Sequence, residues 1–422
     1  MALTKKPVTG MKDITPAEMQ IREYVMNQIR ETYKGFGFSQ IETPCVEHIE
    51  NLTSKQGGDN EKLIFKILKR GDKLNLETAK EEADDLADSG LRYDLTLPLS
   101  RYYANNAANL PSPFKALQMG SVWRADRPQK GRFRQFTQCD IDILGDPTNL
   151  AEIELILATT TALSKICPDN AFTVRINDRG ILFGMARYCG FAEEAMDSVL
   201  ITLDKMDKIG FEGVEKELLE NGNAPESVSR YMEILRTVTN DAEGVKKLGE
   251  TLKDVMDPSV CQGLVHIMET VKDVAEAEFG LVFDPTLVRG MSYYTGTIFE
   301  VSMEGFGGSV AGGGRYDKMI GKFTGMETPA CGFSIGFERI VTILLDNGFT
   351  VPGAGEKKAF LFEKGIDSAS LAAVIREAME ERKKGVRVLV AQMNKNKKFQ
   401  KEQLGKEGYQ EFKEFYKESL KH

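Results

Sequence analysis

The segment 132–144, RFRQFTQCDIDIL, constrains the fold of this 422-residue chain more than any other. Successive side chains of a β-strand point to opposite faces, so its odd and even positions form two separate surfaces. The odd positions are mostly apolar and predict a buried face. The even positions change along the strand from cationic, through aromatic and amide, to anionic: Arg132, Arg134, Phe136, Gln138, Asp140 and Asp142. This order predicts a strand that lines an elongated site, whereas a surface strand with unordered charges is the alternative.

The polar face has the length and the chemistry for a nucleotide joined to a small molecule. Phe136 and Asp142 are about 20 Å apart on an extended strand. The arginine end suits an anion such as phosphate, Phe136 offers a stacking surface, and Asp142 suits a cation or an N–H donor. Arg124, Arg127 and Lys130 add positive charge around the preceding turn, which fits a triphosphate.

Two further candidates are ambiguous. The run AGGGRYD at 311–317 is rich in glycine but lacks the lysine of a P-loop. We interpret residues 305–314 as a turn region in which backbones approach closely. Arg339 lies within the apolar segment GFSIGFERI, and a buried arginine needs a partner, either a carboxylate such as Glu338 or a ligand phosphate. Arg289 has the same ambiguity.

The remaining patterns predict a mixture of helices and strands. A capping box from Thr15 to Glu18, with Pro16 at the first helical position, starts a helix that ends at Gly35. Residues 180–278 have almost purely helical patterns and predict an inserted helical module. Further helices are expected at 99–106, 149–165 and 370–384, and strands at 36–44, 91–99, 115–126, 132–145, 287–303, 358–363 and 386–393.

Composition narrows the setting. The six cysteines are scattered without a CxxC pair, which is typical of reduced thiols in the cytosol, and three histidines make a metal site improbable. No long apolar run or secretory leader is recognisable, so we expect a cytoplasmic protein without membrane attachment. The net charge is −8, but residues 382–422 carry +7. This asymmetry indicates a polyanionic partner or a solvated lysine-rich helix face.

Several long motifs resemble one family. The segment 123–145 resembles the second signature motif of class II aminoacyl-tRNA synthetases, in the form found in histidyl-tRNA synthetases. LVRGMSYYTGTIFEV at 287–301 resembles the segment peculiar to the histidine branch, and GFSIGFERI at 332–340 resembles the third motif. The first motif is similar to the opening helix with FSQIETPCVE at 38–47, and LRYDLTLPLSRYYA at 91–104 also matches. RYDLT, QCDID and YYTG resemble the eukaryote-like subgroup more than the common bacterial form.

The resemblance covers nearly all of residues 7–350 and implies an α+β fold. We expect the class II antiparallel-sheet catalytic core with flanking helices, an inserted helical module and a small C-terminal α/β domain. The implied divisions are a core at 1–180 and 279–350, an insert at 181–278, a linker at 351–356 and a short anticodon-binding-like domain at 357–422.

The resemblance also implies which residues hold the amino acid histidine. Asp94 and Thr96 would hold its α-amino group. Gln138 would help there, near the carboxylate. The two imidazole nitrogens would lie between Asp142 and Tyr294, with Tyr293 beside them, although taken singly such tyrosines are more often core residues.

For ATP, the resemblance places Arg124 at the α-phosphate. The outer phosphates would meet Arg132 and Arg339. Phe136 would stack on adenine, and Asp126 would lie near the amino group of that base. Arg289 would lie between the histidine carboxylate and the α-phosphate, which makes Arg124 and Arg289 the implied catalytic residues.

The implied activity is the formation of histidyl-adenylate from L-histidine and ATP with Mg²⁺, followed by transfer to tRNA(His). A homodimer is also implied, and the magnesium ligands stay unknown. Two departures bear on this expectation. Ser292 stands where the family usually has aspartate, and residues 357–422 contain only two predicted strands, fewer than the family's anticodon-binding domain.

Two other functions remain open at this point. One is a histidine-binding regulatory paralogue that controls histidine biosynthesis without ATP chemistry. The other is an enzyme that forms the adenylate but transfers histidine to a different acceptor. Arg124, Arg289 and Arg339 favour an enzyme, because such paralogues usually lose catalytic arginines.

Overall fold

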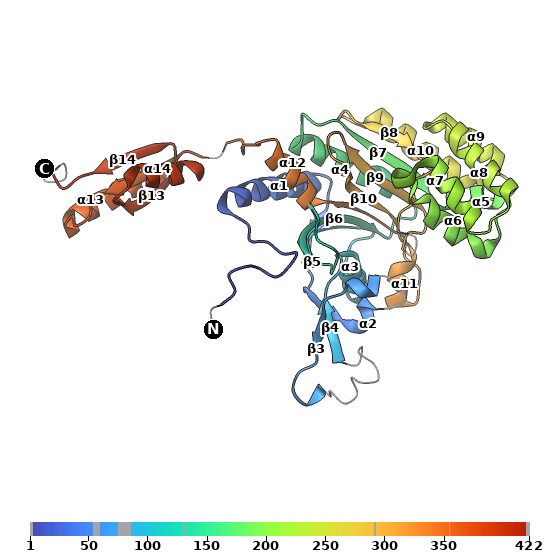
Figure 1. Cartoon of the computed structure of the whole chain (residues 1–422), viewed down its shortest axis with the longest axis horizontal. Coiled ribbons are helices and arrows are strands. Elements are labelled where there is room, and N and C mark those ends of the chain that lie inside the picture. Colours follow the sequence, from blue (N-terminus) through green and yellow to red (C-terminus); the bar gives the residue numbers. More distant parts are fainter. Residues whose placement is uncertain are drawn as a thin grey trace. The chain divides into compact units, whose positions relative to one another are not determined.

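A mostly antiparallel sheet of eight strands forms the centre of the computed structural model (Figure 1). The structure describes residues 3–53, 60–74, 86–129, 131–290, 293–353 and 355–418. The strand order is β1-β5-β6-β11-β10-β9-β7-β8, and the pairs at the two ends are parallel. These strands are β1 (Ser39–Gln40), β5 (Phe114–Trp123), β6 (Gln135–Leu144), β11 (Ala330–Ile335), β10 (Ser309–Arg315), β9 (Thr297–Met303), β7 (Phe172–Asp178) and β8 (Gly280–Phe283). The expected α+β class with an antiparallel core is confirmed.

Two helices in the first 170 residues, α1 and α4, support this sheet. The capping box is present, because the Glu18 backbone N–H donates to Thr15 Oγ1 at 3.4 Å, and α1 spans Pro16–Gly35. The helix α4, Leu150–Ile166, packs on β11 and β6. It is largely buried, because the sheet and α10 (Pro258–Val274) pack against it and Tyr33 of α1 reaches Thr159 within it.

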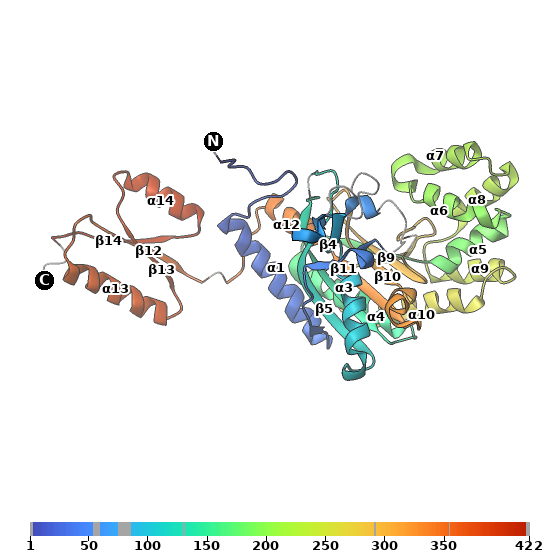
Figure 2. The ribbon, with the colours of Figure 1, turned by 90° about the horizontal axis from the view of Figure 1, so that it is seen from below.

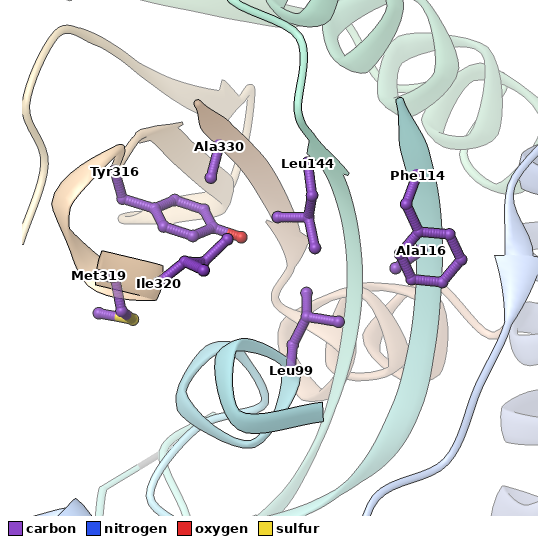
Figure 3. Close-up of a cluster of buried hydrophobic side chains, with 8 residues drawn as sticks. All are labelled: Leu99, Phe114, Ala116, Leu144, Tyr316, Met319, Ile320 and Ala330. Carbon is purple, nitrogen blue, oxygen red and sulfur yellow. The ribbon is translucent and has the colours of Figure 1, made fainter. Parts of the chain in front are cut away.

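Figure 3 shows a hydrophobic core cluster that continues the polar face of β6 at its Leu144 end, where Phe114 and Ala330 are the cross-strand neighbours of Leu144. It joins the helices α3 (Thr96–Asn106) and α11 (Lys318–Thr324) to the strands. Its buried members are Leu99, Phe114, Ala116, Leu144, Tyr316, Met319, Ile320 and Ala330. Tyr293 and Tyr294 pack against this core, so the same side chains that stabilise the fold also support the tyrosine pair.

The predicted helical region is confirmed as a group of helices that follows β7. Figures 1 and 2 both show these helices gathered beside one end of the large sheet. They are α5 (Arg179–Cys189), α6 (Met196–Leu203), α7 (Met206–Glu220), α8 (Pro225–Thr237), α9 (Ala242–Leu252) and α10. The proposed division into core, insert, linker and terminal domain stays a prediction.

The prediction of a strand at 91–99 was wrong. The strand β4, Ala87–Leu91, ends where the predicted strand begins, and α3 starts at Thr96. The first turn of α3 is buried on every side, including the polar Thr96 and Ser100. A helix that is enclosed in this way has no single apolar stripe, so its short sequence shows an alternation that resembles a strand.

The prediction of a turn over residues 305–314 was also wrong for most of its length. The glycine run forms β10, in the middle of the sheet between β9 and β11. A Cβ on Gly313 would lie 2.0 Å from the Gly332 carbonyl oxygen and 2.8 Å from Phe333 Cα. The glycines therefore permit an unusually close approach of two strands, which was the physical role inferred for them.

We expect Gly313→Ala to lower the free energy of unfolding by about 3 kcal/mol or more, because the new methyl group collides with backbone that cannot turn away. Denaturant unfolding followed by circular dichroism measures this change. Gly307→Ala is the matched control and should change stability little, since a Cβ there meets nothing within 4 Å. Wild-type stability in Gly313→Ala would contradict the described spacing of β10 and β11.

The chain divides into two compact units, Met1–Lys12 with Val25–Leu344 and Asp13–Tyr24 with Leu345–His422. The second unit contains a parallel sheet of order β13-β12-β14, with α13 and α14 on either side of the strands in Figure 2. The sequence indicated two strands here, and the short third strand was missed. The elements are β12 (Lys357–Phe362), α13 (Ser368–Lys383), β13 (Arg387–Gln392), α14 (Lys397–Lys406) and β14 (Glu411–Phe415).

A small antiparallel sheet of order β2-β4-β3 lies in the first unit. Its other strands are β2 (Val46–His48) and β3 (Lys66–Leu68), followed along the chain by short helices that include α2 (Ile49–Leu52). Cys45 is exposed, while the other five cysteines are buried and unbridged. Within the described ranges, no helix has the length and apolar character to cross a membrane, and no cluster of metal-ligating side chains occurs.

Candidate active site

A cavity of about 450 Å³ opens on the polar face of β6. The residues that the sequence singled out come from five separate segments of the chain, and the structure brings them together around this one cavity. They are Asp94, Thr96, Arg124, Asp126, Arg132, Phe136, Gln138, Asp142, Arg289, Tyr293, Tyr294 and Arg339. The convergence fits a single binding site, and the role of each residue stays a prediction.

The strand β6 forms one wall of the cavity, with the alternation that its sequence predicts. Phe136, Gln138, Asp140 and Asp142 line the cavity, while the intervening Cys139, Ile141 and Ile143 are buried in the core. The strand is shorter than predicted, because it begins at Gln135.

The residues before β6 form a turn instead of continuing the strand. Arg132 and Gln129 form an isolated antiparallel bridge there. Arg134 is absent from the cavity wall, since its Nε donates to the Asp126 carbonyl oxygen at 3.1 Å and its backbone N–H donates to Gly10. Lys130 lies outside the described residues, as does Ser292.

Glycines opposite the polar side chains make room for them. Gly332 of β11 is paired with Asp142, and a Cβ at Gly332 would lie 2.1 Å from Asp142 Oδ1. Gly312 of β10 would bring a Cβ within 2.6 Å of the guanidinium carbon of Arg289. The absence of side chains at Gly332 and Gly312 therefore leaves space for the Asp142 carboxylate and the Arg289 guanidinium group next to the backbone.

At the cationic end, Arg124 and Arg339 are held by neutral groups. Arg124 Nε donates to the Tyr93 carbonyl oxygen at 3.1 Å, and its guanidinium group lies 4.2 Å from the Tyr93 ring centroid and 5.2 Å from that of Phe136. Arg339 donates to the backbone oxygen of Ser309 and, at 3.3 Å, to its hydroxyl. Neither guanidinium group has a carboxylate within ion-pair distance in the described part of the chain.

Their sequence neighbours do not supply the missing charge. Glu338 Oε1 instead accepts the backbone N–H of Thr137 at 3.1 Å, so it is not the internal partner considered for Arg339. Burial lowers the pKa of Arg339, and the Arg289 cation lowers it further. This end of the cavity therefore favours an anion, which would relieve the repulsion between its arginines.

The other two arginines already have carboxylate partners. Arg132 binds Asp126 through two contacts, 2.9 Å from Nη2 to Oδ1 and 3.1 Å from Nε to Oδ2. Arg289 forms an ion pair with Glu300 of β9. The internal pairing considered for Arg289 is therefore present, and the site adds Glu300, which the sequence reasoning had not marked.

The opposite end of the cavity contains three buried carboxylates. Burial raises the pKa of Asp94, raises that of Asp140 to about 7, and raises that of Asp142 far above its usual range. The carboxylates also raise one another's pKa values by repulsion. A cation or several N–H donors in the cavity would stabilise their ionised forms.

Among the described residues, two acceptor atoms at this end of the cavity have no hydrogen-bond partner. Tyr316 donates its hydroxyl to Asp142 Oδ1 at 2.6 Å, but Asp142 Oδ2 is buried and unpaired. Gln138 Oε1 is also buried and unpaired. Because buried acceptors are nearly always satisfied, their presence in a cavity indicates a ligand that donates hydrogen bonds.

Sequence reasoning missed Tyr316, although it lies in the AGGGRYD run. Its ring belongs to the core in Figure 3 and its hydroxyl faces Asp142, so one residue joins the core to the site. The available signal was a tyrosine just after the glycine run. It was overlooked because the glycine run was interpreted as a turn.

A profile of the histidyl-tRNA synthetase family matches residues 10–340. The chain belongs to the histidyl-tRNA synthetase family. A histidine–tRNA ligase from Leifsonia xyli subsp. xyli (strain CTCB07) is 45% identical over 351 residues, covering 82% of this chain and 81% of that protein. A probable histidine–tRNA ligase from Tropheryma whipplei (strain Twist) is 38% identical over 418 residues, covering 96% and 94%.

Solved structures agree with this membership. The crystal structure of histidyl-tRNA synthetase from Nostoc sp. PCC 7120 aligns with a TM-score of 0.79 at 26% identity, covering 96% of this chain and 90% of that one. A Bacillus halodurans C protein, titled an ATP phosphoribosyltransferase regulatory subunit/histidyl-tRNA synthetase, aligns with a TM-score of 0.77 at 21% identity and shows the shared fold alone. The synthetase fold implied by the sequence motifs is confirmed.

Proposed function

We propose that this histidyl-tRNA synthetase family member activates L-histidine with ATP to histidyl-adenylate and transfers the histidyl group to the 3′ end of tRNA(His). The observation that carries the proposal is the polarity of the cavity. One end has guanidinium groups without carboxylate partners among the described residues, and the other has buried acceptors without donors. A phosphate group and an amino acid with several N–H donors satisfy both ends at once.

The acidic end would bind histidine. Asp94, which caps the first turn of α3 by accepting the Leu97 backbone N–H at 3.1 Å, and Thr96 would hold the α-ammonium group. Asp142 Oδ2 and Tyr294 would take the imidazole nitrogens, with Tyr293 packed edge-on against Tyr294 at 4.9 Å between ring centroids. Such paired recognition penalises an analogue that leaves Asp142 unsatisfied.

The cationic end would bind ATP. Arg124 would meet the α-phosphate, and Arg132 and Arg339 would meet the outer phosphates. Phe136 would stack on adenine, with Asp126 near the amino group of the base. In the structure Asp126 accepts two contacts from Arg132, so this assignment requires the two side chains to share or exchange those contacts when ATP binds.

Magnesium would be carried mainly by the phosphates. The described residues contain no cluster of three or more metal-ligating side chains, and Mg²⁺ at nucleotide sites usually takes most of its ligands from phosphate and water. Its chemistry would be to neutralise phosphate charge, and its protein ligands stay unassigned.

The first reaction needs no general base. The histidine carboxylate is already ionised and attacks the α-phosphorus, while pyrophosphate leaves. The main barrier is the approach of two anions, which Arg124 and Arg289 would lower by holding both groups in line and offsetting their charge. In the second step a hydroxyl of the 3′-terminal ribose attacks the activated carbonyl, and AMP leaves.

Histidine-dependent ATP–pyrophosphate exchange, measured across a panel of amino acids, tests this function. We expect exchange with L-histidine alone, followed by charging of tRNA(His). Histidine binding without any exchange would instead support the regulatory alternative. Exchange without charging would support transfer to a different acceptor. The presence of Arg124, Arg289 and Arg339 around the cavity favours the enzyme.

The C-terminal unit is the proposed tRNA contact, because residues 382–422 carry +7 in a chain of net charge −8. Removing residues 357–422 should therefore raise the KM for tRNA at least about tenfold while leaving histidine-dependent exchange within about twofold. Aminoacylation kinetics measure the first effect, and exchange is the internal control for the catalytic core. Unchanged tRNA kinetics would show that this unit makes no RNA contact.

The cellular setting completes the proposal. We assign the chain to the cytoplasm, where its tRNA and nucleotide substrates occur, and to a homodimer, which the family's first motif implies. Sedimentation analysis of the purified protein tests the dimer directly.

A further inference from the structure

In the described part of the chain, only the nitrogen of the Gln138 side-chain amide has hydrogen-bond partners. Its Nε2 lies 3.3 Å from Asp140 Oδ2, 3.5 Å from Asp140 Oδ1 and 3.3 Å from Ser334 Oγ. Its Oε1 is buried and has no hydrogen-bond partner in the part of the chain that the structure describes. One end of this side chain is therefore fixed in the protein, and the other end faces the cavity that Gln138 lines.

The register in which β6 pairs with β11 and β5 determines which side chains lie beside Asp140. Asp140 is 3% exposed and is paired across β6 and β11 with Ser334, whose hydroxyl donates to Asp140 Oδ1. On its other side Asp140 is paired with Gln118 of β5. The Gln118 amide is occupied elsewhere, because it accepts from Thr43 at 3.2 Å and donates to the Leu95 carbonyl oxygen at 3.0 Å.

Hydrogen-bond chemistry determines which way the Gln138 amide points. With the α-ammonium group of the substrate in the cavity Asp140 is ionised, because a nearby cation stabilises the charged form of a carboxyl group. An ionised carboxylate only accepts, and the Ser334 hydroxyl donates its proton to it, so that hydroxyl oxygen can only accept from Gln138. Only the NH₂ group of Gln138 can satisfy these two oxygens. The reversed amide would place its oxygen against two other acceptors and leave a buried NH₂ group without partners.

We propose that Asp140 is a positioning residue that holds the Gln138 amide with its oxygen toward the α-ammonium group of the amino acid. The inference rests on the proposed function, and it narrows the expectation that Gln138 lies near both the amino group and the carboxylate. A carbonyl oxygen can only accept, and a substrate carboxylate has no proton to give. The α-ammonium group has three N–H donors, of which Asp94 and Thr96 would take two.

Binding of two substrate analogues to the full chain separates these contacts. Histidinol keeps the ammonium group and lacks the carboxylate, whereas 3-(imidazol-4-yl)propionate keeps the carboxylate and lacks the ammonium group. Asp140→Asn offers Gln138 both a donor and an acceptor, so it no longer enforces one orientation. We expect titration calorimetry to show about tenfold weaker binding of histidine and histidinol, with the propionate within twofold of wild type.

A double-mutant cycle distinguishes an effect of Asp140 through Gln138 from a direct effect of the Asp140 charge on the ammonium group. Gln138→Met keeps the length of the side chain and removes both polar atoms. If Asp140 acts through Gln138, the double variant binds histidinol no more weakly than Gln138→Met alone. If the affinity losses of the two single variants multiply in the double variant, Asp140 attracts the ammonium group directly, and this result would overturn the proposal. Weaker binding of the propionate would also overturn it, because the amide would then face the carboxylate.

Folding and the proposed function are tested separately. ATP binding and the thermal midpoint should stay at wild-type values in each variant. If Asp140→Asn does not fold, Ser334→Ala removes one acceptor from the same network and should give the same analogue pattern at about threefold. If the wild-type protein binds neither histidine nor histidinol, the proposed function is refuted. If the wild-type protein binds both but the variants do not show the expected pattern, only the role of Asp140 is refuted.

Discussion

Replacing Arg289 by alanine is expected to lower the kcat of histidine-dependent ATP–pyrophosphate exchange by about 10²- to 10³-fold. A preorganised charge at the reacting centre typically contributes about 3–4 kcal/mol to the barrier. The guanidinium group of Arg289 lies over Gly312 and is anchored by Glu300, so its position is fixed before any ligand arrives. Truncation removes the positive charge and leaves a gap between the two anions that must meet.

The fold should survive this change. Glu300 keeps a second cation, Arg175, at 3.5 Å, so the loss of Arg289 does not leave its carboxylate alone. Arg236→Ala is the matched control, because Arg236 also pairs with a glutamate, at 3.0 Å, but lies outside the cavity wall. We expect wild-type exchange in the control. Wild-type exchange in folded Arg289→Ala would remove Arg289 from the chemistry.

Replacing Asp142 by alanine is expected to lower kcat/KM for histidine by about 100-fold. Asp142 Oδ2 is a buried acceptor without a hydrogen-bond partner among the described residues, and its loss would leave the imidazole N–H of the proposed substrate without a partner in a buried site. The KM for ATP should change little, because the proposed nucleotide site is at the other end of the cavity. Exchange kinetics with histidine and ATP varied independently measure the two effects.

A milder variant checks the orientation of that carboxylate. Tyr316→Phe keeps the ring in the hydrophobic core and removes only the hydroxyl that holds Asp142 Oδ1 at 2.6 Å. It should raise the KM for histidine about tenfold or less, with unchanged kcat. Equal histidine affinity in wild type and Asp142→Ala would mean that the amino acid is oriented differently in the cavity.

The β6 wall could be predicted because its signal is local. A period of two along one strand places Phe136, Gln138 and Asp142 on one face, whatever the rest of the chain does. Outside β6, the residue patterns marked the arginines only as candidates. The family resemblance joined them with Asp94, Thr96 and the tyrosine pair in one site, because it encodes long-range proximity that no local pattern contains. The structure brings both groups together on one cavity.

The failures share a physical cause, which is dependence on neighbours in space. Glycines 312–314 have low strand propensity, and their use in β10 depends on the close approach of β11 and on the side chain of Arg289. The ion pair of Arg289 with Glu300 depends on the register of β9 and β10, where Gly312 lies opposite Glu300. Buried α3 lacks the amphipathic stripe from which helices are recognised.

The position of β6 within its sheet has a consequence for how the enzyme could be altered. Ladders of backbone hydrogen bonds to β5 and β11 hold β6 on both sides. In the proposed assignment this inextensible segment carries Phe136 at one reactant and Asp142 at the other, so it fixes the distance between them. Substitutions on its polar face would then retune affinity for either reactant separately, while the separation of nucleophile and electrophile stays constant.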